Sequence, residues 1–271
     1  MEKNETPQGY VDISQLKKYA NDLAEVYKLE RERRKDLEDV NKALQAAYLD
    51  TIYRLSLAAE YKDEDTGEHI MRMGRFSALL AEKYGLPSED VQQILYAAPM
   101  HDVGKIGIPD SILMKPGKLT HAEFEVMKTH TTIGAKLLAN SKAAILRVAE
   151  QIALHHHERW DGKGYPFGLS KKETPLVGRI VGLFDVFDAL TSRRPYKDPY
   201  PIDVAISIIQ EGQGKQFDPD LVDIFLDNLD TIREIKKNAP FSEVLENATS
   251  HTFTWSERDR VHGVDKKIGK E

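Results

Sequence analysis

Apolar residues recur every seven positions along the N-terminal part of the chain, and residues 12–60 contain no Gly or Pro. Two positions of each heptad are apolar, and they hold Leu16, Leu23, Leu37 and Leu44 in one and Tyr19, Val26, Val40 and Ala47 in the other. Such a pattern predicts a long helix that forms a coiled coil. Glu30 and Arg33 interrupt both positions in the middle, where they either fix the register of the pairing or end it.

A single amphipathic helix that lies on its own domain is the alternative to a coiled coil. A helix on a domain surface carries a wider apolar stripe, whereas apolar residues here fill only two positions per heptad. The pattern therefore favours a coiled coil, and a parallel homodimer is the expected assembly.

The pattern from about residue 57 to residue 240 is helical throughout, and alternating segments typical of strands are scarce. Ser88 is the expected N-cap of one helix, and Thr120 with Glu123 forms an expected capping box. The sequence predicts an all-α fold in three parts: an N-terminal helix over 1–56, a helical domain over 57–240 and a polar tail over 241–271.

The composition narrows the class of protein. Lys plus Arg is 38 and Asp plus Glu is 44, and this net charge of -6 does not suggest binding to a nucleic acid polymer. Because the chain has no cysteine, disulfides, Cys-ligated zinc and a cysteine nucleophile are excluded. We expect a soluble, cytoplasmic protein with no membrane contact, since the sequence contains neither an apolar run of about 18 residues nor a signal-peptide core.

Six of the nine histidines lie beside acids or other histidines: His69, His101, His130, His155, His156 and His157. A lone histidine is more often a core or capping residue, but a group of six weakens that interpretation. Side chains adjacent on a helix point about 100° apart, so His101 and Asp102 cannot easily bind one ion from the same face. Adjacent ligands instead suggest a centre with ions about 3.5–4 Å apart. Nitrogen and oxygen ligands suit Fe, Mn, Ni and Co as well as Zn.

Three segments in order, HDVGKIGIPD, HHERWDGKGYPFGL and RIVGLFDVFDALTSRRPYK, closely resemble the HD-GYP family of HD-domain phosphohydrolases. The family is named after the motifs that stand here at His101-Asp102 and Gly164-Tyr165-Pro166. The resemblance runs from about His69 to Pro219, and the whole ordered set is far more specific than an HD pair alone. It implies an HD-domain helical bundle with two or three metal ions, often iron, with manganese or other ions as alternatives. It also implies hydrolysis of the bacterial second messenger cyclic di-GMP to linear pGpG, with a further step to GMP left open.

Carried over by position, the resemblance implies seven metal ligands: His69, His101, Asp102, His130, His156, His157 and Asp185. Asp102 would be the bridging carboxylate, and Lys105 would reach a phosphate oxygen, so both are expected to take part in catalysis. Asp65 stands where three-metal members have a glutamate ligand, which makes it an eighth candidate with a shorter side chain. His155 has no counterpart in the family pair, and we expect it to support the ligands or the fold.

The resemblance further implies that Lys105, Tyr165, Arg194 and Lys197 contact the substrate. Arg can bind a phosphate through two hydrogen bonds, and a solvated basic helix end is the alternative role of Arg194 and Lys197. Tyr165 either stacks on a guanine or packs its own loop. The family links this loop with GGDEF domains, so a GGDEF-domain or sensor protein is an expected partner.

Two other functions stay open at this point. One is the hydrolysis of a related substrate, such as cyclic GMP-AMP or a deoxynucleotide triphosphate, although the GYP loop argues against a triphosphate. The other is a non-catalytic receptor for cyclic di-GMP. Degenerate members of the family usually lose ligands, so the intact set here favours an enzyme in which a metal-bridging hydroxide attacks phosphorus.

Overall fold

The computed structural model describes residues 12–63, 67–193 and 198–237, and helices dominate these ranges. Within them, β-type pairing is limited to isolated bridges between Asp161 and Ser170 and between Gln213 and Phe217. The all-α prediction is confirmed. Among the described residues we find no helical segment whose length and hydrophobicity would let it span a lipid bilayer.

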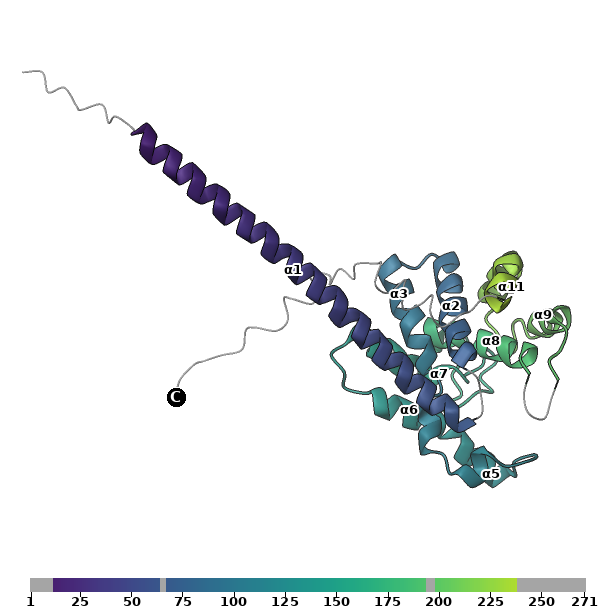
Figure 1. The fold of residues 1–271 in the computed structure, drawn as a ribbon. Helices are drawn as coiled ribbons and strands as arrows, with labels where there is room; N and C mark the ends of the chain where they lie inside the picture. Colours follow the sequence, from purple (N-terminus) through teal and green to yellow (C-terminus); the bar gives the residue numbers. More distant parts are fainter. Residues whose placement is uncertain (1–11, 64–66, 194–197, 238–271) are drawn as a thin grey trace, which may run out of the picture. The chain divides into compact units, whose positions relative to one another are not determined.

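Helix α1 (Ile13–Glu60) is the long helix that the N-terminal pattern predicts (Figure 1). Among the described residues, the chain divides near Tyr48 into two units, residues 12–47 and residues 48–237. In the first unit, the heptad residues Leu16, Leu23, Leu37 and Leu44 are each more than half exposed. The second unit includes the last turns of α1, and the predicted domain boundaries at residues 56 and 240 stay predictions.

The remaining helices follow in the second unit. They are α2 (Gly67–Tyr84), α3 (Ser88–Ala97), α4 (Asp110–Leu113), α5 (His121–Lys128), α6 (His130–Leu138), α7 (Ala144–His155), α8 (Leu176–Thr191), α9 (Ile202–Glu211), α10 (Pro219–Asp227) and α11 (Leu229–Lys237). Short 3₁₀ segments join them: η1 (Tyr61–Asp63), η2 (Ala98–Met100), η3 (Val103–Gly107) and η4 (Lys171–Glu173). Each of α2, α3, α7 and α8 packs against two others of these four, while α6 packs on α7 and η3.

Aromatic side chains from three helices form the centre of the core. The rings of Phe76 and Phe184 are stacked with centroids 4.8 Å apart, and the rings of Phe187 and Phe225 meet edge to face at 5.2 Å. All four rings are fully buried. Burying a phenylalanine side chain stabilises a fold by about 1.5–3 kcal/mol, so this cluster holds α2, α8 and α10 together.

Local signals explain some helix ends. The predicted capping box of α5 is confirmed, because Thr120 accepts a hydrogen bond from the Glu123 amide and the Glu123 carboxylate accepts one from the Thr120 amide. The predicted N-cap role of Ser88 is wrong. Helix α3 already begins at Ser88, and Pro87 occupies the cap position without a side-chain hydrogen bond.

Two glycines let the segments that carry the histidines approach closely. A Cβ on Gly104 would lie 1.9 Å from the carbonyl oxygen of His130, so η3 can meet the start of α6 only with glycine there. A Cβ on Gly182 would lie 2.3 Å from the carbonyl oxygen of His156, so α8 can approach the end of α7 this closely only with glycine there. The fold thus brings the ends of several helices to one place.

Candidate metal centre

Segments that are far apart in the sequence supply the predicted ligands to one region. His101 and Asp102 lie between η2 and η3, and His130 opens α6. His156 and His157 follow α7 directly, His69 lies in the first turn of α2, and Asp185 lies on α8.

The Asp102 carboxylate lies among three imidazoles. Its Oδ1 atom is 3.2 Å from His130 Nε2 and 3.5 Å from His156 Nε2. Its Oδ2 atom is 3.4 Å from His101 Nε2, and that nitrogen is also 3.9 Å from Asp185 Oδ1. Asp102 therefore occupies the central position that a bridging carboxylate requires.

Each of these three histidines is oriented by a hydrogen bond of its Nδ1 atom, the ring nitrogen that faces away from Asp102. The Nδ1 atoms of His101 and His130 lie 3.0 Å and 2.7 Å from the carbonyl oxygens of Ala98 and Met127. His156 Nδ1 lies 3.1 Å from two carbonyl oxygens of α7. Since a carbonyl only accepts, Nδ1 carries a proton and Nε2 is the ring nitrogen that faces Asp102. This is the usual arrangement of histidines that bind a metal.

The histidine Nε2 atoms and the Asp102 carboxylate that they face are buried. His101, His130 and His156 are at most 2% exposed, and Asp102 is 6% exposed. The Nε2 atoms of these three histidines and Asp102 Oδ1 have no hydrogen bond within the described part of the chain. Buried polar atoms without partners destabilise a fold unless something else satisfies them. Ligand atoms of Asp102, His130, His156 and His157 all lie within 4.8 Å of one another, so these residues fit a bound cation.

The electrostatics favour the protonation states that bind a metal. Burial by itself would raise the pKa of Asp102, but Lys105 and His101 hold it well below its ordinary value. Burial lowers the pKa of His156, and burial with the neighbouring imidazoles lowers that of His157 well below its usual range. The aspartate is therefore ionised and these two histidines are neutral, as ligands must be.

His101 differs from the other two. Burial disfavours its charged form, yet Asp102, Asp185 and Glu60 raise its pKa to about 9. A cation that binds at His101 Nε2 would therefore have to displace a proton.

Lys105 lies against the centre. Its Nζ atom is 2.8 Å from Asp102 Oδ2. The lysine that the resemblance assigns to a phosphate oxygen is thus paired here with the predicted bridging carboxylate.

A second group of potential ligands lies beside the first and includes a residue that the sequence did not single out. Ligand atoms of Glu60, His69 and His101 lie within 4.8 Å of one another, and all three residues are buried. Burial raises the pKa of the Glu60 carboxyl group, with Lys105 opposing it. Glu60 is the last residue of α1. In the sequence it is only one of several acids ahead of His69, so spacing alone could not select it.

Asp188 orients His69, and this contact too was missed. Asp188 Oδ2 is 2.8 Å from His69 Nδ1. Arg72 Nε and Lys236 Nζ each lie 2.7 Å from Asp188 Oδ1. Burial by itself would raise the pKa of this carboxyl group, but His69 and Arg72 hold it well below its ordinary value. The only sequence signal was a second acid one turn after Asp185, in FDVFDAL.

The GYP loop borders the centre. The Tyr165 ring lies 4.8 Å from the His157 ring and 6.2 Å from the Phe124 ring, and its backbone N–H donates to the His157 carbonyl. Tyr165 therefore packs on a candidate ligand. His155 stays apart from the cluster, with Nδ1 2.8 Å from the Gln151 carbonyl.

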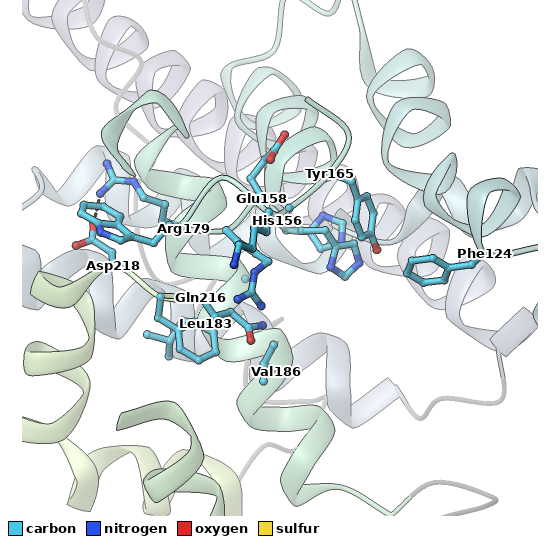
Figure 2. A pocket seen from close by; sticks show the side chains of 16 residues that line it. Phe124, His156, Glu158, Tyr165, Arg179, Leu183, Val186, Gln216 and Asp218 are labelled. Atoms are coloured by element: carbon cyan, nitrogen blue, oxygen red, sulfur yellow. Dashed lines mark hydrogen bonds and ion pairs between the residues drawn. The ribbon is translucent and has the colours of Figure 1, made fainter. Parts of the chain in front are cut away.

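A cavity of about 310 Å³ continues from the centre. His156, His157, Tyr165, Trp160 and Arg179 are among the residues that line it. Figure 2 shows Arg179 and Asp218 at one end and Tyr165 and Phe124 at the other. Arg179 pairs with Asp218 and lies 5.9 Å from the centre of the Trp160 ring, so this end combines an aromatic face with a cation.

Three predicted residues lie outside the described residues: Asp65, Arg194 and Lys197. Their predicted contacts with a metal ion or with the substrate stay predictions.

Comparisons with known proteins agree on one family. Residues 54–221 match the family model described as HD domain. The chain is 51% identical over 172 residues to a cyclic di-GMP phosphodiesterase of Thermotoga maritima, which covers 64% of this chain and 47% of that protein. It is 49% identical over 177 residues to a cyclic di-GMP phosphodiesterase response regulator of Xanthomonas campestris pv. campestris, covering 65% and 47%. A 3'3'-cGAMP-specific phosphodiesterase of Vibrio cholerae is 40% identical over 205 residues, covering 76% and 38%.

The chain spans less than half the length of these curated relatives. A solved structure of a cyclic GMP-AMP specific phosphodiesterase of V. cholerae aligns with a TM-score of 0.55 and 17% identity. That alignment covers 74% of this chain and 52% of the other. At this identity the likeness shows the fold alone.

Proposed function

Since the chain belongs to the HD domain family, in its HD-GYP group, we propose that it is a metal-dependent phosphodiesterase that hydrolyses cyclic di-GMP. One molecule of water would be consumed, one bond between phosphorus and a ribose 3′ oxygen would break, and linear pGpG would be released. Relatives that are named cyclic di-GMP phosphodiesterases support this substrate.

The observation that carries the proposal is the set of buried atoms around Asp102. Three imidazole Nε2 atoms approach its carboxylate, and those nitrogens and Oδ1 lack hydrogen bonds in the described part of the chain. A purely structural cluster would pair these groups with protein donors and acceptors. Cations bound on the two sides of Asp102 would satisfy all of them, with His130 and His156 serving one side and His101 the other.

The proposed ligands are the seven residues of the family pattern, with His130, His156 and His157 nearest one side of Asp102 and His69 with His101 nearest the other. We propose two or three divalent transition-metal ions, iron first and manganese as the alternative, because the donors are nitrogen and oxygen only. When bound, such ions supply an acidified water and neutralise charge on a phosphodiester.

Side chains of the protein would position the substrate beside this centre. Lys105 lies against Asp102 and is close enough to exchange that contact for a phosphate oxygen. Arg194 and Lys197 are proposed as further phosphate contacts, since a cyclic dinucleotide carries two negative charges. The cavity is near the lower limit of ligand pockets, so we assign it to one nucleoside rather than to the whole substrate.

A second substrate has support from a specific observation. One relative that aligns with 76% of this chain is named a 3'3'-cGAMP-specific phosphodiesterase. Cyclic GMP-AMP therefore has to be compared directly with cyclic di-GMP. A non-catalytic receptor is the third candidate, and the intact ligand set argues against it.

The surroundings of the enzyme are also part of the proposal. We propose a homodimer formed through α1, a GGDEF-domain or sensor protein as partner, and a cytoplasmic location. The exposed heptad leucines of α1 support the dimer. The partner and the location depend on the family resemblance and on the sequence composition.

Product analysis tests the function. The protein is purified without oxygen, its metals are measured, and it is incubated with cyclic di-GMP or 3'3'-cGAMP before chromatography. We expect at least two metal ions per chain and conversion of cyclic di-GMP to pGpG. Asp102→Ala is the matched control, and it should lose both metal and activity, because a bridging ligand serves two ions.

Each alternative gives a different outcome. Turnover of 3'3'-cGAMP alone would change the substrate. Tight binding of cyclic di-GMP without turnover by the metal-loaded protein would favour the receptor. At most one ion per chain would contradict the proposed centre.

A further inference from the structure

We propose that Glu60 is a metal ligand and that, with His69 and His101, it forms a cation position for a divalent transition metal beside the one centred on Asp102. This inference rests on the metal centre proposed above. It adds a carboxylate from the end of α1, which the family pattern carried over by sequence does not include.

Glu60 is a buried carboxylate with an oxygen atom that is unpaired in the described part of the chain. The residue is 1% exposed although it ends a helix whose N-terminal half is exposed. Its Oε2 atom has no hydrogen-bond partner among the described residues. A carboxylate is rarely buried without a pairing group, because the loss of hydration is large. Glu60 Oε2 therefore lacks a partner among the atoms of the described residues, and a bound cation would supply one.

The two imidazoles of the group are arranged to share an ion with Glu60. The rings of His69 and His101 stand edge to face with centroids 5.4 Å apart. Asp188 and the Ala98 carbonyl occupy their Nδ1 atoms, so the Nε2 atoms remain available for binding. His101 Nε2 has no hydrogen bond in the described part of the chain either.

A proton on Glu60 would explain the geometry less well than a cation does. A protonated carboxyl group donates a hydrogen bond, and no acceptor lies within hydrogen-bond distance of Oε2 in the described residues. One cation among the three ligand atoms, which lie within 4.8 Å of one another, would satisfy Glu60 and His101 together.

Glu60 is a different residue from the one that the sequence suggested as an additional carboxylate ligand. That candidate is Asp65, which lies outside the described residues. Glu60 has one methylene group more than aspartate, and the helix holds its backbone. It can therefore supply the ligand whether or not Asp65 does.

Metal stoichiometry tests the inference without relying on catalysis. Manganese is added to the metal-free full-length protein, and free and bound Mn²⁺ are measured by electron paramagnetic resonance. Glu60→Gln, which keeps the shape and removes the charge, should bind one ion fewer per chain than the unchanged protein. The remaining ion or ions should bind normally, because the ligands around Asp102 are intact.

Glu68→Gln is the matched control. Glu68 is also a glutamate next to His69, but its side chain is 76% exposed and pairs only loosely with Arg72, at 3.4 Å. The Glu68→Gln substitution removes one negative charge close to the centre, as Glu60→Gln does. We expect unchanged stoichiometry in Glu68→Gln, and an equal loss in both variants would mean a general charge effect and would contradict the inference.

A folding defect would not prevent the test. If Glu60→Gln does not fold, Glu60→Asp keeps the charge and draws the carboxylate back by one methylene group. Its affinity for the lost ion should then be at least about tenfold weaker in competition with a chelator. Unchanged Mn²⁺ stoichiometry and affinity in a folded Glu60 variant would overturn the inference.

The result can be separated from the proposed function. A wild-type protein that hydrolyses cyclic di-GMP, with a Glu60→Gln variant that keeps every ion, would refute the role of Glu60 alone. A wild-type protein that binds no Mn²⁺ would refute both.

Discussion

At the scale of residues, the histidines of the centre are held in two different ways. Backbone carbonyls three or four residues earlier in the chain orient His101, His130 and His156. The Asp188 carboxylate, which Arg72 and Lys236 hold in turn, orients His69. A carboxylate partner makes an imidazole a more basic ligand than a carbonyl does. Asp188 is therefore a positioning residue for His69.

We predict that Asp188→Asn weakens metal binding. Asparagine can still accept the hydrogen bond of His69, but it removes the negative charge that makes the imidazole basic. The affinity for the ion at His69 should fall about tenfold, as measured by chelator competition with Mn²⁺.

Asp203→Asn serves as the control for this prediction. Asp203 pairs with Arg233 at 3.0 Å on the surface, with its side chain 82% exposed, so the same substitution should leave the affinity unchanged. Thermal melting shows whether Asp188→Asn is folded, because buried Arg72 and partly buried Lys236 each lose an ion pair. A folded Asp188→Asn protein with normal affinity would show that the contact does not tune the ligand.

At the scale of elements, one face of helix α8 supplies two carboxylates to the candidate metal centre. Asp185 and Asp188 are three residues apart, so their side chains lie on the same side of the helix. One approaches His101 and the other bonds to His69. A small rotation of α8 would move both contacts together.

The capping box of α5 gives a prediction at the same scale. Thr120→Ala removes the oxygen that accepts the Glu123 amide hydrogen bond. We expect the free energy of unfolding to fall by about 1 kcal/mol in urea denaturation. Thr132→Ala is the comparison, because its exposed hydroxyl only donates to a carbonyl of the preceding turn. Equal losses in the two variants would mean that the box adds nothing beyond an ordinary threonine.

At the scale of the whole molecule, α1 is expected to form the dimer. Four heptad leucines per chain are exposed, and each contributes about 1.5–3 kcal/mol when buried. That suffices to hold two chains together in spite of Glu30 and Arg33.

Deleting residues 1–45 should therefore give a monomer that retains its metals, because Glu60 and all the histidine ligands remain. Ultracentrifugation with metal analysis measures both properties. A truncated protein that is still dimeric would place the interface in the second unit.

A point variant checks which face of α1 pairs. Leu23→Asp places a charge at a heptad position and should weaken the dimer. Leu29→Asp changes an exposed leucine of the same helix outside both heptad positions, and it should have a smaller effect. A full-length protein that is monomeric at all concentrations would show that the heptads do not pair two chains.

The sequence by itself determined the helical class, the long N-terminal helix and the family. Helical periodicity and the capping box at Thr120 are local signals. Ligands that are adjacent in the sequence, such as His101 and Asp102, can likewise be recognised without knowing which other residues join them. Only the tertiary structure decided which carboxylates join them. Glu60 ends α1, Asp188 lies in the last turn of α8, and Lys236 lies on α11, near the end of the described chain. Their roles depend on burial and on the direction of each ring nitrogen, and packing between segments distant in the sequence sets both.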